Sequence, residues 1–109
     1  MGGKRTQGSY GCRVKVLAKI SLLPTEAGGR TEPIIGSFRP NHSFSPGMFV
    51  IGQVEHRPGA ELFPGESADL VVDFIPDGVP ALTPGTKWNL YDGPSHLIGS
   101  ATLLRVIAD

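Results

Sequence analysis

The side chains best suited to catalysis or metal binding are three histidines and one cysteine. His42, His56 and His96 are widely separated, and no two lie two or four residues apart, the spacings that would present a pair of imidazoles to one metal ion. Cys12 precedes Arg13, a neighbour that favours the thiolate, but no histidine is near it in sequence. We therefore predict three surface histidines, an ordinary thiol and no metal site.

Two other features associated with enzymes are also missing from the sequence. Asp69 and Asp73 fall on one face of a predicted strand, and at strand rise they lie about 13 Å apart, too far to share a proton. No Gly-x-x-x-x-Gly-Lys-Ser/Thr loop is present to cradle a nucleotide phosphate. We expect no enzymatic activity and no cofactor.

Two arginines in the stretch 28–44 point to binding. A guanidinium can hold a carboxylate or phosphate with two parallel bonds. Arg30 follows two glycines, and anchoring a partner and supporting the local structure are equally consistent with its position. Arg39 lies between Phe38 and Pro40, a position that favours bracing a loop through backbone carbonyls. The predicted partner-binding residues are Arg30, Thr31, Arg39 and Asn41.

Charge is unevenly distributed along the chain. Lysines and arginines number 10, as do aspartates and glutamates, yet the residues before Glu26 include five bases and no acid. A basic first strand suggests an alternative, an RNA-contacting surface, although a solvated strand face is the simpler explanation. Its residues would be Arg13, Lys15, Lys19 and His96. A domain with zero net charge lacks the field for tight nucleic-acid binding, so we expect no DNA partner.

Period-two alternation and frequent turns predict an all-β fold. The chain of 109 residues contains 15 glycines and 10 prolines, and no window shows a convincing helical period. The expected strands are 13–23, 34–44, 48–55, 67–75, 86–92 and 97–107. Short strands with many turns favour a closed, six-stranded antiparallel β-barrel. We assign 1–11 to a flexible leader and 12–109 to a single barrel domain.

The alternation also predicts which residues are buried. The expected shared interior is Val16, Ile20, Val50, Leu70, Val72, Trp88 and Leu90. The last strand is apolar on both faces, which is typical of a strand buried on two sides, and its Gly99 suggests a bulge or bend. Leu62 and Phe63 are expected to cover one barrel end.

The sequence favours a cytoplasmic protein without a membrane partner. One cysteine allows no internal disulfide, and no apolar run approaches the roughly 20 residues that span a bilayer. The first 12 residues contain no apolar segment typical of a signal peptide.

Four segments, in order, resemble a known domain. They are 28–40 (GGRTEPIIGSFRP), 63–66 (FPGE), 87–93 (KWNLYDG) and 97–101 (LIGSA). Their order and spacing resemble the C-terminal β-barrel domain of the elongation factor Tu family, over about residues 13–107. Thr31 and Glu32 replace a histidine and a threonine of the family pattern, and Ile34 and Ile35 replace two phenylalanines.

The resemblance carries functional expectations. In that family the barrel packs against a GTPase domain and touches the T stem of aminoacyl-tRNA. The resemblance therefore implies a non-catalytic binding module that contacts a translation-related protein or a GTPase. Two alternatives remain: an RNA- or tRNA-contacting module that uses the basic first strand, and an immunity or decoy protein.

Overall fold

The computed structural model describes residues 14–75 and 79–108, and in these ranges the regular elements are strands apart from one short 3-10 helix. The elements are β1 (Val14–Leu22), the 3-10 helix η1 (Thr25–Ala27), β2 (Ile34–Ile35), β3 (Asn41–Ser45), β4 (Met48–Glu55), β5 (Glu61–Leu62), β6 (Ser67–Phe74), β7 (Lys87–Asp92) and β8 (His96–Ala108). No helix within the described ranges is long and apolar enough to cross a bilayer. The leader assigned to 1–11, together with Cys12 and Arg13, lies outside the described residues.

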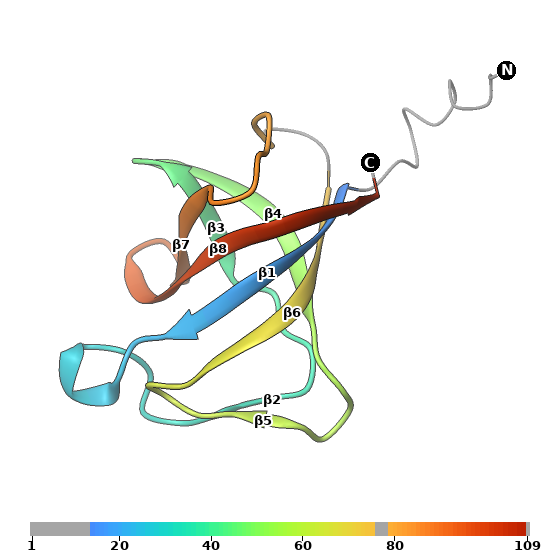
Figure 1. The fold of residues 1–109 in the computed structure, drawn as a ribbon. Coiled ribbons are helices and arrows are strands. Elements are labelled where there is room, and N and C mark those ends of the chain that lie inside the picture. The colour runs from blue at the N-terminus through green and yellow to red at the C-terminus, as the bar shows by residue number, and fades with distance from the viewer. Residues whose placement is uncertain (1–13, 76–78, 109) are drawn as a thin grey trace, which may run out of the picture.

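Six strands close into an antiparallel barrel. They pair in the order β1–β6–β4–β3–β7–β8, and β8 returns to pair with β1 (Figure 1). The predicted all-β class and closed six-stranded barrel are confirmed. The predicted ranges for β1, β4, β6, β7 and β8 agree with the observed strands to within one residue at each end.

The predicted strand 34–44 is wrong, because the chain leaves the barrel between two short strands. Gly36 has a φ of 71° and reverses the chain after β2, a conformation that glycine adopts without a side-chain clash. Phe38 then forms an isolated bridge with Val54, and β3 begins only at residue 41, after a proline that cannot donate to a ladder. The chain therefore makes two separate strands here.

β2 and β5 form a two-stranded ribbon at one end of the barrel (Figure 1). Ile34 pairs with Leu62, and both side chains are buried in the core. Leu62 thus covers the barrel end as predicted. Phe63 does not, since 45% of it is exposed.

The interior is filled by one face of each barrel strand. On β1, Val16, Ala18 and Ile20 are fully buried while Lys19 is exposed, as alternation predicts. Six of the seven predicted core residues are buried: Val16, Ile20, Val50, Val72, Trp88 and Leu90. Leu70 is only half-buried at the edge of this core.

β8 is not buried on two sides, contrary to the prediction. Its first half places Ile98, Ala101 and Leu103 inside, but from Leu104 through Ile107 the side chains are exposed. The ladder with β1 shifts twice, so that Leu104 and Ile107 are extra residues without a partner opposite them. Each such bulge interrupts the alternation, which explains why consecutive apolar side chains reach solvent here.

Gly99 marks a close approach between strands. It lies opposite Leu22 of β1, and a Cβ added to it would collide with the backbone oxygen of Ser21. The β7–β8 register also shifts beside it, with Ile98 as the extra residue. The predicted irregularity at Gly99 is therefore confirmed.

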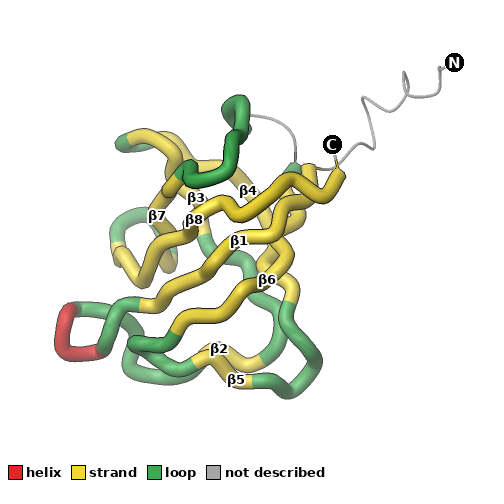
Figure 2. Tube along the Cα trace, in the orientation of Figure 1, coloured by secondary structure: helices red, strands yellow, loops and turns green. Residues whose placement is uncertain are grey.

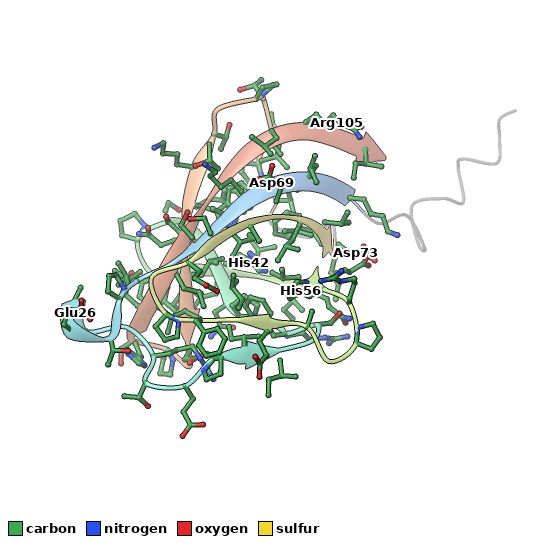
Figure 3. All side chains as sticks on the ribbon, turned by 60° about the horizontal axis from the view of Figure 1, so that its bottom comes forward. Glu26, His42, His56, Asp69, Asp73 and Arg105 are labelled. Atoms are coloured by element: carbon green, nitrogen blue, oxygen red, sulfur yellow. The ribbon has the colours of Figure 1, made fainter. Side chains whose placement is uncertain are left out.

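His42 is the main error among the predicted surface residues, because it is fully buried in the barrel interior (Figure 3). The Trp88 Nε1–H donates to His42 Nδ1 at 3.0 Å, so Nδ1 carries no proton. The neutral ring therefore holds its proton on Nε2, which donates to the Gly52 carbonyl at 3.0 Å. With both nitrogens bonded, the imidazole is buried without an unsatisfied polar atom.

The surroundings of His42 are aromatic and tightly packed. The Phe74 ring meets it edge-on, with 4.8 Å between centroids. Gly52 allows this approach, because a Cβ there would lie 2.7 Å from Phe74 Cδ1. Burial lowers the pKa of His42 to about 4, partly offset by the bond to Gly52.

Substituting Val72 tests the placement of the core. Val72 is fully buried, so Val72→Ala loses the transfer free energy of two methyl groups and leaves a cavity. The free energy of unfolding, measured in urea, should fall by about 1–3 kcal/mol. Val71→Ala is the matched control on the outer face of the same strand, and an equal loss there would contradict this assignment.

Buried His42 predicts acid lability. The pKa is lowered in the folded state to about 4 from 6.5, so the unfolded chain binds a proton first as pH falls. The stability associated with a neutral His42 is complete above pH 6.5 and is lost between pH 6.5 and 4. Between pH 7.5 and 5 this single group should cost roughly 2 kcal/mol of unfolding free energy.

The measurement is urea unfolding of the wild type and His42→Gln at both pH values. The variant should show a smaller difference between the two, because carboxylates titrate equally in both proteins. His56→Ala, which removes a side chain outside the core, should retain the wild-type difference. A His42→Gln protein with an unchanged difference would show that another group causes the acid sensitivity.

Candidate functional site

A cavity of about 310 Å³ lies where the chain between η1 and β3 meets the end of β7. Its lining combines two guanidinium groups, one carboxylate and an apolar wall. The lining residues are Arg30, Pro33, Ile34, Ile35, Phe38, Arg39, Pro40 and Asp92. We call this the Arg30–Arg39 cavity; the structure brings together both arginines that the sequence singled out.

Arg30 is held in place by Asp92. Its Nη1 donates to Asp92 Oδ2 at 2.7 Å, and its Nε donates to the backbone oxygen of Glu32 at 3.3 Å. The two members of the pair are 62 residues apart, and their side chains are 28% and 42% exposed. Arg30 therefore joins the loop before β2 to the end of β7.

The loop that carries Arg30 depends on its two glycines. Gly28 has a φ of 93° and ends η1, while a Cβ on Gly29 would lie 2.5 Å from the Leu23 carbonyl oxygen. The loop is closed further by Thr25, whose hydroxyl donates to the Arg30 carbonyl at 2.6 Å. Figure 2 shows this segment folding back on itself around η1.

Two further hydrogen bonds join the same regions. The Asn41 amide donates to the Gly93 carbonyl at 2.7 Å, and His96 Nε2 donates to the Gly28 carbonyl at 2.8 Å. Asn41, predicted to bind a partner, thus braces the β7–β8 hairpin. His96, predicted for an RNA surface, lies on the Arg30 side of the molecule.

Arg39 has a different environment from the one expected. The residue is exposed, and its Nε donates to the side-chain oxygen of Gln53 at 3.4 Å rather than to backbone carbonyls. Among residues 14–75 and 79–108, no carboxylate forms an ion pair with it. Within the described ranges Arg39 thus lies at the cavity without an ion pair, whereas Arg30 is the bracing residue. Thr31 is exposed and does not line the cavity.

An exposed apolar strip adjoins Arg39 on the outer face of the barrel. Asn41 lies opposite both Ile51 of β4 and Tyr91 of β7. Ile51 is 56% exposed, and the exposed Phe49 ring packs against Tyr91 with 5.6 Å between centroids. We call Phe49, Ile51 and Tyr91 the Ile51–Tyr91 strip.

The basic residues of β1 lie beside acids of the neighbouring strand β6. In the β1–β6 ladder, Lys15 lies opposite Asp73 and Lys19 lies opposite Asp69. The Lys15 ammonium is also 4.0 Å from a Glu55 carboxylate oxygen. Strand pairing thus places the acids of β6 beside the bases of β1. Of the other residues assigned to RNA contact, His96 bonds to Gly28 and Arg13 is not described.

No three His, Cys, Asp or Glu side chains in the described ranges are arranged to hold a metal ion. A shallow depression combines charged and apolar side chains, and its lining is Leu17, Glu55, His56, Arg57, Ala68, Asp69, Leu70 and Val71. Another, beside Trp88 and Tyr91, is lined by aromatic rings, serines, an asparagine, a proline and Lys87. Each of these depressions contains a single arginine or lysine, Arg57 or Lys87, whereas the Arg30–Arg39 cavity brings two guanidinium groups to one lining.

No protein-family model matches the chain. What the structure establishes is a six-stranded antiparallel β-barrel domain with this cavity at one end.

Sequence reasoning missed Asp92, which enters the sequence analysis only as a member of the segment 87–93. Its role depends on barrel closure, which brings the β7–β8 hairpin beside the loop 28–30. The apolar wall of the cavity was also missed. In a single strand 34–44, Ile35 and Phe38 would face opposite sides, whereas in the structure both line the cavity.

The two arginines should differ in their effect on stability. Arg30→Ala removes the link to Asp92 and the bond to Glu32, and should lower the free energy of unfolding by about 0.5–1 kcal/mol, since the pair is partly exposed. Arg39→Ala should change it by less than about 0.5 kcal/mol. Urea unfolding at pH 7 measures both. A larger loss for Arg39→Ala would restore the bracing role to Arg39.

Proposed function

We propose that the chain is a non-catalytic protein-binding module whose partner docks over the Arg30–Arg39 cavity and the Ile51–Tyr91 strip. The observation that carries this proposal is Arg39, an exposed arginine without an ion pair in the described part of the chain, at a cavity with apolar walls. An isolated surface arginine is ordinary, but one flanked by exposed Ile35 and Ile51 is characteristic of interfaces.

The size and chemistry of this surface favour a protein over a small molecule. Ile35, which lines the cavity with Arg39, is 60% exposed, and Ile51, two residues before the Gln53 that Arg39 contacts, is 56% exposed. Apolar surface of this kind, rimmed by polar groups, marks protein interaction sites. The resemblance to the elongation factor Tu C-terminal barrel supports the further proposal that the partner is a GTPase or a translation component.

An RNA partner would instead use the outer face of β1. That face pairs Lys15 and Lys19 with aspartates of β6 in the ladder, which reduces the positive field available to phosphates. The protein-binding proposal is therefore preferred, and RNA binding becomes an outcome of its test.

The test is capture of proteins from a lysate by the immobilised chain, with and without nuclease. Arg39→Ala should weaken retention of the captured protein about tenfold, the loss expected for one charge-assisted bond of roughly 1.5 kcal/mol, without lowering Tm. The double variant Lys15→Ala/Lys19→Ala is the control and should retain the wild-type affinity. Loss of capture in the control, with steep salt dependence and nuclease sensitivity, would favour the RNA alternative.

A further inference from the structure

The Arg30–Asp92 pair lies inside the proposed docking site, and the geometry of the pair suggests regulation. Among the described residues that line the cavity, two are cationic and Asp92 is the one acid. The lining therefore carries one unbalanced positive charge. Arg30 and Arg39 also line the same cavity.

We propose that Asp92 is a built-in competitor that occupies Arg30 until an acidic side chain of the docking partner replaces it. This inference rests on the proposed function and adds the chemical class of the partner's anchor, which is an Asp or Glu flanked by apolar residues. The partner's carboxylate would bind between Arg30 and Arg39, while its neighbouring apolar side chains contact Ile35 and Phe38.

The existing bond is suited to exchange. Asp92 receives one bond, from Nη1 to Oδ2, rather than the two parallel bonds of the strongest arginine–carboxylate pairs. Its side chain is 42% exposed, so water can solvate the carboxylate once it is released. Ion pairs that are this exposed contribute little net stability, so displacing Asp92 is inexpensive.

Release of Asp92 would leave the surrounding structure joined. Asn41 still bonds to Gly93, and His96 still bonds to Gly28. These two contacts hold the β7–β8 hairpin against β3 and the loop 28–30 without any contribution from the ion pair. The Arg30 side chain also retains its bond to the Glu32 carbonyl. The exchange therefore needs only side-chain movement.

The charges around the cavity favour a single carboxylate over a polyanion. Exposed Glu32 flanks the segment, and exposed Glu61 lies opposite Ile35 in the β2–β5 ladder. A phosphate backbone that extends beyond the cavity would meet these carboxylates as well as Asp92. An isolated acid with apolar neighbours meets two arginines and an apolar wall instead.

The experiment measures binding of a labelled hexapeptide that contains one glutamate between leucine and phenylalanine. Asp92→Asn keeps the shape of the side chain and removes its charge, and should raise affinity about threefold, the size of an exposed ion pair. Glu61→Gln is the matched control, because it removes an equal charge nearby without a bond to Arg30; it should change affinity by less than about twofold. A peptide with glutamine in place of glutamate should not distinguish Asp92→Asn from the wild type.

A second readout does not depend on the variants folding. It uses the NMR spectrum of the wild type. Adding the peptide should shift two signals together, that of the Asp92 side-chain carboxyl carbon and that of Arg30 Nε. If Asp92→Asn and Glu61→Gln behave alike, or the Asp92 resonance stays fixed while the peptide binds, Asp92 is not a competitor. If either result is found while Arg39→Ala still weakens binding, the proposal that Asp92 competes for Arg30 is wrong, but the proposed docking site is supported.

If the glutamate peptide binds no better than its glutamine counterpart, the carboxylate anchor is overturned. If in addition Arg39→Ala has no effect on protein capture, the docking site itself is wrong. An oligouridine could also bind more strongly than the peptide and lose its binding in Lys15→Ala/Lys19→Ala. That result would show that the binding site is on β1 and that the partner is RNA.

Discussion

Closure of the barrel by β8 against β1 is the constraint on which the other features depend. β1 lies between β6 and β8, paired antiparallel to both. This arrangement gives the six strands a common interior and leaves no first or last strand in the order. It also brings the β7–β8 hairpin beside the loop that carries Arg30, so that residues separated by 62 positions form one wall of the cavity.

The same interior explains how a polar ring came to lie at the centre. His42, Trp88 and Phe74 come from three strands, and Gly52 from a fourth leaves space for them. An apolar side chain at position 42 would leave the Trp88 N–H without an acceptor in a place water cannot easily reach. The histidine is therefore a component of the core, with both ring nitrogens bonded.

Local pattern predicted the fold well because each barrel strand has one face in the core and one outside. Prediction failed where the chain departs from that rule. In 34–44 the reversal at Gly36 was invisible to alternation, and in β8 two extra residues moved apolar side chains to the surface. His42 was placed outside because a buried histidine needs two partners, and Trp88 and Gly52 lie 46 and 10 residues away.

The candidate site, too, could be predicted from the sequence only in part. Arg30 and Arg39 could be singled out from residue type and neighbours, but their roles could not, since Asp92 and Gln53 reach them only through tertiary pairing. The apparent separation of charge along the sequence also disappears in the fold. β6 supplies the acids that lie opposite the bases of β1.

The two extra residues of β8 have a consequence for how molecules of this chain meet one another. Leu104, Val106 and Ile107 are exposed at the end of β8, beyond Thr102, the last residue of that strand that pairs with β7, and a regular apolar strand segment unpaired on one side can template amyloid-like growth. Growth of that kind requires several consecutive backbone groups in phase. Here the register with β1 shifts at Leu104 and again at Ile107. Only Arg105 and Val106 remain in one continuous register between the two shifts. Two residues are too few to template a neighbour, and one of them is charged. The irregular strand thus carries exposed apolar side chains without presenting a regular strand to a neighbouring molecule.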